Sequence, residues 1–218
     1  ALMVLIVLSG CIALNLRIQR IRAKLQQQRE ALAQALEVNR ELATRDELTG
    51  LINRRAMLDL MALEHRRSLR SGRPLLLAQL DIDHFKRIND QYGHATGDRA
   101  LQAFAGTVRA SVRDTDVLAR WGGEEFVLML SDTSADHGRE LLERIRQAVQ
   151  ALEIAHSAGT LHLTVSIGLA QHLRGDTVEH TLERADQALY RAKALGRNRV
   201  VMAPAAHRPV AAGSNARA

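Results

Sequence analysis

Two acidic segments of this 218-residue chain could together hold a divalent cation. Asp81-Ile82-Asp83 ends an apolar run with strand character, and Glu124-Glu125 follows two glycines. Paired glycines permit a tight turn with positive φ and let a ligand approach the backbone closely. Crowded carboxylates are costly unless something positive lies beside them. Because Mg²⁺ binds through one or two carboxylates plus substrate phosphates, converging acidic strand ends predict a metal-dependent site for a phosphate ligand. Taken alone, the Gly-Gly-Glu-Glu segment fits a solvated hairpin tip better than a metal site.

The elements that must position these acids alternate between helices and strands. Helices are predicted over residues 54–70, 85–91, 98–112, 135–152 and 178–195. Strands are predicted over residues 75–83, 161–170 and 200–203, and as two runs within 117–130 on either side of Gly122-Gly123. The glycine pair predicts a β-hairpin there. The whole pattern predicts an α+β fold with a mixed or antiparallel central sheet flanked by helices.

Three segments in order resemble the GGDEF family of diguanylate cyclases. They are DELTGLINRR (46–55), DIDHFKRINDQYGHATGD (81–98) and RWGGEEF (120–126), and the resemblance extends over residues 46–202. It implies a catalytic domain with a nucleotidyl-cyclase or palm-like fold over residues 46–203. It also implies a reaction that joins two GTP molecules into cyclic di-GMP.

The resemblance assigns the acidic residues to metal binding and proton removal. Asp81 and Glu124 match the metal-binding carboxylates, the carbonyl of Ile82 assists them, and Glu125 matches a helper in proton removal. Two ions per half-site, Mg²⁺ or Mn²⁺, are implied. No residue that the family pattern requires is replaced.

The resemblance also assigns residues to the nucleotide. Asn89 and Asp98 match the pair that reads guanine, whose two adjacent N–H donors suit a carboxylate and whose remaining edge suits an amide. A plain helix N-cap is the alternative role for Asp98, and it could serve both. The backbone N–H groups of Phe85 and Lys86 match a loop that wraps the phosphates, and Gly122 and Gly123 line the substrate.

Lys193 and Arg197 match the cations that hold the terminal phosphates, at the last turn of a helix and just past Gly196. A solvated charge cluster is the alternative. Each GTP must attack the other to make a two-fold symmetric product, so the implied enzyme is a homodimer with two half-sites facing each other across a C2 axis.

An Arg-x-x-Asp unit precedes the predicted hairpin. In the family this spacing marks an inhibitory site for the product, formed here by Arg113 and Asp116 with Arg144 as a secondary arginine. A forked guanidinium suits a phosphate or a guanine edge. Considered alone, the unit also fits a surface ion pair.

The charge distribution excludes a general nucleic-acid binder. Of the formal net charge of +6, residues 17–45 carry +4 and the tail from residue 203 carries +2, which leaves residues 46–202 neutral. A neutral globular part lacks the basic footprint that such proteins need. The single cysteine, Cys11, excludes an intramolecular disulfide framework.

The first 16 residues carry no charge and are followed by Arg17, Arg20, Arg22 and Lys24. This pattern predicts the inner end of a truncated transmembrane helix, with the catalytic domain on the cytoplasmic side of the inner membrane. A signal-peptide core and a lipoprotein cleavage box at Leu8-Ser9-Gly10-Cys11 are the alternatives.

Residues 17–45 have the spacing of a weak coiled coil. Its seam runs through Ile18, Ile21, Leu25, Gln28, Leu32, Ala35, Asn39 and Leu42. The prediction is a signalling stalk that pairs two protomers; a single amphipathic helix packed on the domain is the alternative. Residues 204–218 are predicted to be a disordered tail.

Three other functions compete with the cyclase. They are a non-catalytic nucleotide receptor of the same fold, another cyclase or polymerase-palm-like enzyme, and a membrane-tethered scaffold that acts through its stalk. The complete acidic, cationic and guanine-reading set favours the diguanylate cyclase over each of them.

Overall fold

The computed structural model describes residues 3, 17, 19–20, 22–32, 43–156 and 159–204. The chain divides into two units, Ala1–Thr44 and Arg45–Ala218. The described residues 22–32 of the first unit are helical. Among them Leu25 and Leu32, two positions of the predicted seam, are exposed in the single chain.

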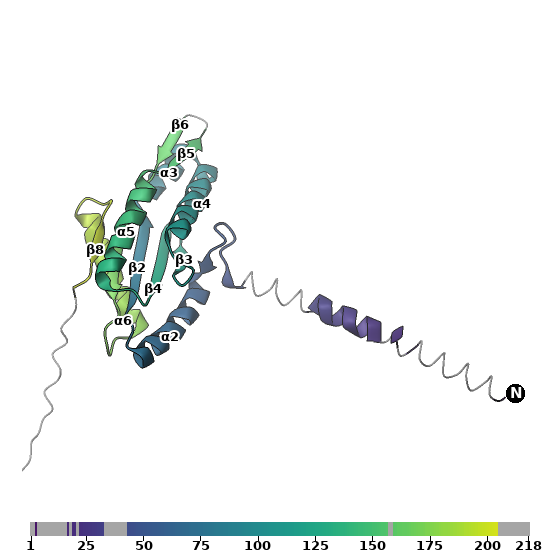
Figure 1. Cartoon of the computed structure of the whole chain (residues 1–218). Helices are drawn as coiled ribbons and strands as arrows, with labels where there is room; N and C mark the ends of the chain where they lie inside the picture. The colour runs from purple at the N-terminus through teal and green to yellow at the C-terminus, as the bar shows by residue number, and fades with distance from the viewer. Residues whose placement is uncertain are drawn as a thin grey trace, which may run out of the picture. The chain divides into compact units, whose positions relative to one another are not determined.

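A six-stranded mixed sheet forms the centre of the second unit (Figure 1). In spatial order its strands are β1 (Ile52–Asn53), β3 (Val117–Gly122), β4 (Glu125–Ser131), β2 (Leu75–Ile82), β7 (Val165–Gln171) and β8 (Val200–Met202). The two outer pairs, β1 with β3 and β7 with β8, are parallel, and the inner pairs are antiparallel. A separate hairpin consists of β5 (Glu153–His156) and β6 (Gly159–His162).

Five helices accompany this sheet: α2 (Arg54–Ser71), α3 (Phe85–Tyr92), α4 (His94–Ser111), α5 (Ala135–Gln150) and α6 (Val178–Ala194). Side chains cap three of them, because Asn53, Ser134 and Thr177 each accept a hydrogen bond from a backbone N–H in the first turn. Gly72 ends α2 in the left-handed conformation, with φ of 70°.

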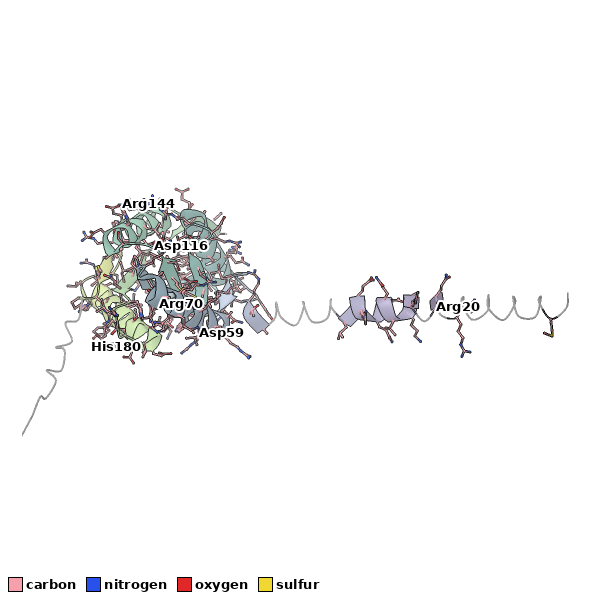
Figure 2. The ribbon with its side chains drawn as sticks, turned by 60° about the horizontal axis from the view of Figure 1, so that its bottom comes forward. Arg20, Asp59, Arg70, Asp116, Arg144 and His180 are labelled. Atoms are coloured by element: carbon pink, nitrogen blue, oxygen red, sulfur yellow. The ribbon has the colours of Figure 1, made fainter. Side chains whose placement is uncertain are left out.

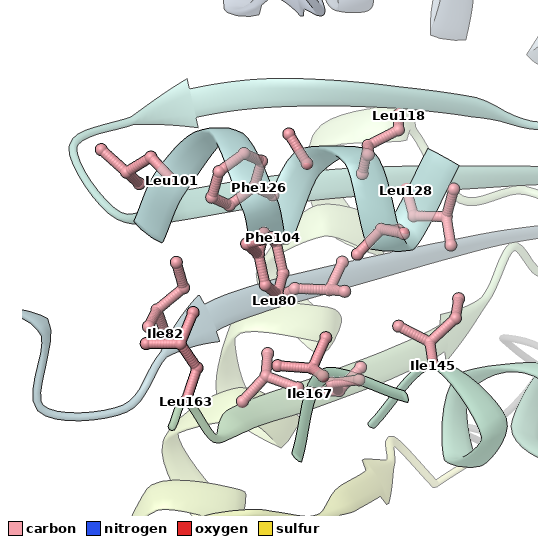
Figure 3. Close-up of a cluster of buried hydrophobic side chains, with 14 of the residues drawn as sticks. Leu80, Ile82, Leu101, Phe104, Leu118, Phe126, Leu128, Ile145, Leu163 and Ile167 are labelled. Carbon is pink, nitrogen blue, oxygen red and sulfur yellow. The ribbon is translucent and has the colours of Figure 1, made fainter. Parts of the chain in front are cut away.

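The helices cover both faces of the sheet, so the strands are apolar on both sides. On one face, α3, α4 and α5 pack on alternate strand residues such as Leu80, and Phe104 of α4 meets Phe126 of β4 with ring centroids 4.6 Å apart (Figure 3). On the other face, α2 and α6 pack on the intervening residues such as Leu77. Nearly every residue of β2 is buried as a result.

Helix α6 lies very close to β7 at Gly168. A Cβ atom at that position would fall 2.1 Å from the carbonyl oxygen of Ala185 and 2.2 Å from the backbone nitrogen of Leu189. Only glycine therefore permits this approach. The close packing fixes the helix whose last turn carries Lys193.

The predicted α+β class, with a mixed sheet, flanking helices and a hairpin at Gly122-Gly123, is confirmed. Two element predictions were wrong. Residues 161–170 are not one strand, because residues 159–162 pair with β5 and β7 begins at Val165. The helix predicted from residue 98 begins at His94, so Asp98 lies inside α4 and is not its N-cap.

The predicted membrane segment, residues 1–16, and the predicted tail, residues 204–218, lie outside the described residues, apart from Met3 and Pro204. Of the predicted stalk, residues 18, 21 and 33–42 also lie outside them. Within the described part of the chain, no helix has both the length and the apolar character that a membrane span requires.

Candidate active site

The two acidic segments meet at the end of the sheet where β2 stops and the β3–β4 hairpin turns. Asp81 of β2 lies directly opposite Glu125 of β4 in the antiparallel register. Next to this pair, the backbone N–H of Ile82 donates to the carbonyl oxygen of Glu124 at 3.4 Å. Residues more than 40 positions apart in the sequence thus share one corner of the fold.

Glycine allows the turn that carries the glutamates. Gly123 has a φ of 46°, in the region that side chains other than glycine's rarely adopt. A Cβ atom at Gly122 or Gly123 would meet no other atom within 4 Å, so the surface above the turn is open. Glu124 is half-buried, whereas Glu125 is exposed.

A cation from α6 completes the acidic corner. The Nζ of Lys193 lies 2.7 Å from Oδ2 of Asp81, which is itself 7% exposed. Burial raises the pKa of Asp81 above its ordinary value; Lys193 opposes this, while the negative charges of Glu124 and Glu125 add to it. The three carboxylates are therefore close enough to act on one another. Lys193 is not part of a solvated cluster.

The donor chemistry of this corner fits a hard divalent cation. Carboxylate and carbonyl oxygens are the ligands that Mg²⁺ prefers. In the described part of the chain, no three His, Cys, Asp or Glu side chains gather as a complete ligand set. Asp81 and Glu124 could thus hold an ion only together with backbone, water or substrate oxygens, which is how Mg²⁺ is usually bound beside phosphates.

The predicted guanine-reading residues come from α3 and α4. A Cβ atom at Gly97 of α4 would fall 1.9 Å from Oδ1 of Asn89 on α3. This contact brings Asn89 next to the residue that precedes Asp98. Asn89 is half-buried and Asp98 is exposed, as expected for a pair that a base can reach.

The predicted phosphate loop is the first turn of α3. The phenyl ring of Phe85 belongs to the core, so only its backbone can serve a ligand, and the Lys86 side chain is exposed. His84 precedes them in the left-handed conformation, with φ of 58° and no side-chain cap. The first N–H groups of a helix have no acceptor within it, which leaves them available for phosphate oxygens.

Arg197 lies beyond the C-terminal end of α6, past Gly196. Its side chain is exposed, and among residues 43–156 and 159–204 no carboxylate lies within ion-pair distance of its guanidinium. Among the described residues, Arg197 therefore has no ion-pair partner, whereas Lys193 pairs with Asp81.

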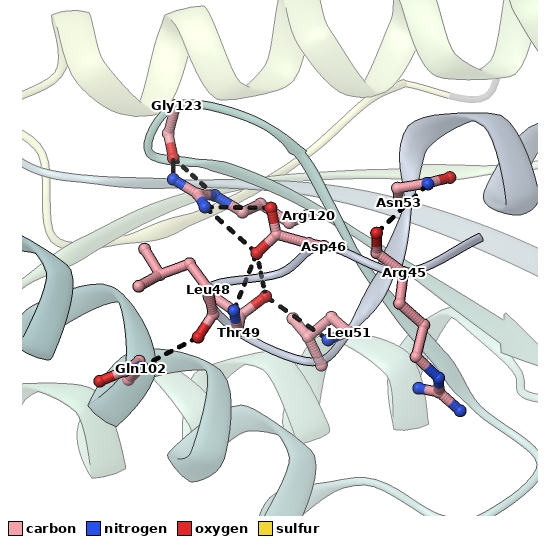
Figure 4. A network of polar contacts seen from close by, with 9 residues as sticks. All are labelled: Arg45, Asp46, Leu48, Thr49, Leu51, Asn53, Gln102, Arg120 and Gly123. Atoms are coloured by element: carbon pink, nitrogen blue, oxygen red, sulfur yellow. Dashed lines mark hydrogen bonds and ion pairs between the residues drawn. The ribbon is translucent and has the colours of Figure 1, made fainter. Parts of the chain in front are cut away.

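One contact network that sequence reasoning missed ties the hairpin to the start of the domain (Figure 4). Arg120 donates from Nη1 to both carboxylate oxygens of Asp46 at 3.1 Å, and from Nε and Nη2 to the carbonyl oxygen of Gly123 at 3.0 and 2.8 Å. Thr49 donates to Asp46 from its backbone N–H and its hydroxyl. Burial alone would raise the pKa of Asp46, but these partners outweigh burial and lower it.

This network fixes the turn that carries Glu124 to the first residues of the globular unit. A single arginine bridges the two segments through its fork of donors. The one signal in the sequence was that Asp46 and Arg120 open two of the three family-like segments.

The residues of the predicted inhibitory site line one cavity of about 240 Å³. Arg113, Asp116 and Arg144 share it, together with Ser111, Thr133, His137, Glu140 and Leu141. Figure 2 labels Asp116 and Arg144 on the globular unit. Asp116 immediately precedes β3 and Gly122 ends it, so the cavity lies about 20 Å along the strand from the hairpin turn, at about 3.3 Å per residue.

The Arg113–Asp116 unit is not a surface ion pair. Asp116 is only 9% exposed, and its Oδ2 accepts from the backbone N–H of Arg113 at 3.1 Å. Its Oδ1 is buried with no hydrogen-bond partner in the described part of the chain. Burial raises the pKa of Asp116, and the contacts to Arg113 only partly offset this. A buried acceptor without a partner is costly, so this atom is suited to a ligand's N–H donor.

Known proteins resemble this chain over most of its length. Residues 43–199 match the family model described as "Diguanylate cyclase, GGDEF domain". Diguanylate cyclase DgcP of Pseudomonas aeruginosa is 46% identical over 179 residues, which cover 82% of this chain and 27% of that protein. The response regulator PleD of Caulobacter vibrioides is 41% identical over 187 residues, which cover 84% and 41%. The chain therefore spans less than half the length of these curated relatives.

A solved structure agrees with the fold. The coiled coil and GGDEF domain of DgcB from Caulobacter crescentus, in complex with c-di-GMP, matches with a TM-score of 0.82 at 34% identity. The match covers 85% of this chain and 99% of that one. The acidic corner, the hairpin and the matched residues lead to one conclusion: this chain belongs to the GGDEF family of diguanylate cyclase domains.

Proposed function

We propose that this protein is a diguanylate cyclase that joins two GTP molecules into cyclic di-GMP and releases two pyrophosphates. The observation that carries the proposal is the meeting of Asp81 with Glu124 and Glu125, beside Lys193, at one corner of the sheet. Family relatives with the same activity in their names support it.

In each half-reaction the 3′-hydroxyl oxygen of one GTP forms a bond to the α-phosphorus of the other. The bond from that phosphorus to the bridging oxygen breaks, and pyrophosphate leaves. Such transfers depend chiefly on positioning and on stabilising the charge that develops.

The residues of the chain divide this work. Asn89 and Asp98 bind the guanine, and the backbone N–H groups of Phe85 and Lys86 hold phosphate oxygens. Lys193 and Arg197 bind the terminal phosphates and neutralise the leaving pyrophosphate. Glu125 is exposed above the open turn, where it can take the proton of the 3′-hydroxyl.

Asp81, Glu124 and the Ile82 carbonyl would hold the divalent ions, Mg²⁺ or Mn²⁺. When bound, such ions lower the pKa of the attacking hydroxyl and neutralise phosphate charge. Lys193 pairs with Asp81 and offsets part of the negative charge of this corner.

Two protomers are needed, since one half-site positions one GTP. The proposed coiled coil over residues 17–45 would raise the effective concentration of the second half-site. The exposure of Leu25 and Leu32 in the single chain is consistent with a seam that awaits a partner. Residues 1–16 would hold the protein at the inner membrane, with the domain in the cytoplasm where GTP is found.

The product regulates its own synthesis in this proposal. Cyclic di-GMP would bind in the cavity of Arg113, Asp116 and Arg144, away from the acidic corner. Its guanine would donate to the unpartnered Oδ1 of Asp116, and its phosphates would meet the arginines.

The test is to incubate purified protein with GTP and Mg²⁺ and to identify the product by mass. Cyclic di-GMP and pyrophosphate are expected, with a rate per protomer that falls as the protein is diluted and its dimers dissociate. Binding of GTP without any product would instead identify a nucleotide receptor. A constant rate per protomer in solutions shown to be monomeric would refute the two half-sites.

A further inference from the structure

Asp83, two residues beyond the metal-binding Asp81, is buried at 5% exposure, and its carboxylate accepts hydrogen bonds on both oxygens. Its Oδ1 accepts from the hydroxyl of Ser166 at 2.7 Å. Its Oδ2 accepts from the hydroxyl of Thr164 at 2.8 Å and from the backbone N–H of Asn198 at 3.0 Å. Because protein donors occupy both oxygens, we assign Asp83 a structural role and not a role as a metal ligand.

The third donor belongs to the loop that carries Arg197. Three consecutive residues of this loop are left-handed: Gly196, Arg197 and Asn198 have φ of 110°, 63° and 44°. Glycine adopts this region freely and asparagine tolerates it, but a long side chain such as that of Arg197 does so at a cost. Such a conformation persists only where the surroundings impose it, and it is common at ligand-binding positions.

Three sets of contacts hold this loop in its left-handed conformation. The backbone N–H of Arg197 donates to the carbonyl oxygen of Ala192 at 3.0 Å. The side chain of Asn198 contacts α5, accepting from Arg146 at 2.9 Å and donating to Gln150 at 3.2 Å. Asp83 connects the loop to the strand end that carries Asp81.

The backbone of the loop is therefore held, whereas the Arg197 guanidinium is not. That group has no ion-pair partner among residues 43–156 and 159–204, although the backbone beneath it is in a strained conformation. A fixed backbone beneath an unpaired cation is what a phosphate-binding arginine needs, because less freedom is lost when the ligand binds.

We propose that Asp83 is a positioning residue for the terminal phosphates of GTP: it fixes the Arg197 loop relative to Asp81. The end of β2 then positions Asp81 near the α-phosphate. Through Asp83, it also positions the Arg197 guanidinium near the β- and γ-phosphates. This inference rests on the proposed function, since it takes GTP as the ligand.

The test measures binding without turnover. The probes are the α,β-methylene analogue of GTP, whose bridge cannot be cleaved, and GMP, which lacks the terminal phosphates. Asp83→Ala weakens binding of the analogue about tenfold and leaves GMP binding within about twofold, because one charge-assisted contact to the phosphates is lost. Asp83→Asn keeps one acceptor for the Asn198 N–H and weakens the analogue by only about threefold, since neutral acceptors are weaker.

An Arg197→Ala background separates positioning from general damage. If Asp83 acts through Arg197, neither Asp83 variant weakens the analogue further in that background. Should Asp83→Ala fail to fold, the same cycle with Asp83→Asn decides. The proposal would be overturned if the Asp83 substitutions weakened binding of the analogue as much in the Arg197→Ala background as in the wild type. It would also be overturned if they weakened GMP binding as much as analogue binding.

Ser166→Ala is the matched control. It removes a donor from the other oxygen of the same carboxylate, so it lowers stability but keeps the preference for the analogue over GMP. A loss of that preference in Ser166→Ala would also overturn the assignment to the Asn198 contact. A protein that passes these binding tests but makes no cyclic di-GMP would contradict the proposed function and leave this inference intact.

Discussion

Lys193 and Asp81 form an ion pair of 2.7 Å between the last turn of α6 and the end of β2. The lysine offsets the negative charge of a corner that also contains Glu124 and Glu125. Lys193 thus compensates part of the negative charge of the proposed metal and phosphate site. In the proposed reaction, Lys193 would move from Asp81 to the terminal phosphates of GTP.

Lys193→Met tests this exchange. The variant keeps the aliphatic stem but removes the charge that serves Asp81 and the phosphates. We expect kcat/KM for GTP to fall by about 10-fold to 100-fold, mainly through KM, because a charge-assisted contact is lost. Arg191→Met, on the same helical turn, is the control and should leave kcat/KM unchanged. Equal effects of the two substitutions would show that only the net charge matters.

Arg120→Lys tests the network that holds the hairpin. Lysine keeps the charge but cannot donate to Asp46 and to the Gly123 carbonyl at once. We expect kcat to fall about tenfold and the free energy of unfolding to fall by about 1–2 kcal/mol. Steady-state kinetics and denaturant unfolding measure the two effects.

The control for Arg120→Lys is Arg73→Lys. Arg73 pairs with Asp132 at 3.0 Å, but both side chains are more than half exposed, so this pair contributes below about 1 kcal/mol. A normal kcat in Arg120→Lys would mean that the hairpin does not depend on this network.

Asp116→Asn tests the inhibitory cavity and its pH dependence. Burial raises the pKa of Asp116, so the folded state binds this proton more tightly than the unfolded state, and the ionised carboxylate costs stability above that pKa. The variant should therefore be more stable than the wild type at neutral pH. It should also lose inhibition by cyclic di-GMP by about tenfold or more, as should Arg113→Ala.

The same pKa predicts how wild-type inhibition responds to acid. As pH falls through the raised pKa of Asp116, the carboxylate gains a proton and stops accepting from guanine, so the inhibition constant rises. Inhibition that is independent of pH in the wild type, or unchanged in Asp116→Asn, would contradict the assignment.

His172 lies on the face of the sheet opposite α4, where its contacts predict a sensitivity of the fold to acid. Its Nε2 contacts Nδ1 of His65 in α2 at 2.7 Å, and its Nδ1 contacts Oγ1 of Thr181 in α6 at 2.7 Å. Burial, and next the neighbouring His65, lower the pKa of His172 below its ordinary 6.5. The folded state should thus bind fewer protons than the unfolded state, and we expect the free energy of unfolding to fall as pH drops below about 6.5.

His172→Gln should reduce the loss of stability at acid pH. We expect a smaller difference in the free energy of unfolding between about pH 7.5 and about pH 5.5 than in the wild type, measured by denaturant unfolding. His162→Gln, at an exposed position of β6, should leave the difference as it is. If His172→Gln also leaves it unchanged, the acid sensitivity arises elsewhere.

The sequence predicted the elements whose signals are local. The apolar run of β2, the glycine turn after β3 and the capped helices are examples. The strand predicted over residues 161–170 was wrong because Leu161, Leu163, Val165, Ile167 and Leu169 alternate without interruption. The break before Val165 arises from pairing, since residues 159–162 bond to β5 instead.

The start of α4 was misplaced for a similar reason. Gly93 and Gly97 have the character of helix breakers, yet Gly97 lies inside α4. It is glycine there because a side chain would collide with Asn89 of α3, which no local pattern shows. The sequence analysis missed the structural contacts of Asp83 and the Arg120–Asp46 contact, which depend on partners 74 to 115 residues away. No local pattern specifies such partners.

The most direct test of whether the two acidic segments form one catalytic site is to neutralise one carboxylate in each segment separately. Asp81→Asn and Glu124→Gln are compared with the wild type in GTP and Mg²⁺, with the product identified by mass and folding checked by circular dichroism. If β2 and the hairpin form one catalytic corner, the wild type makes cyclic di-GMP and each folded variant makes none. Full product formation by either folded variant would show that its carboxylate is not part of the site.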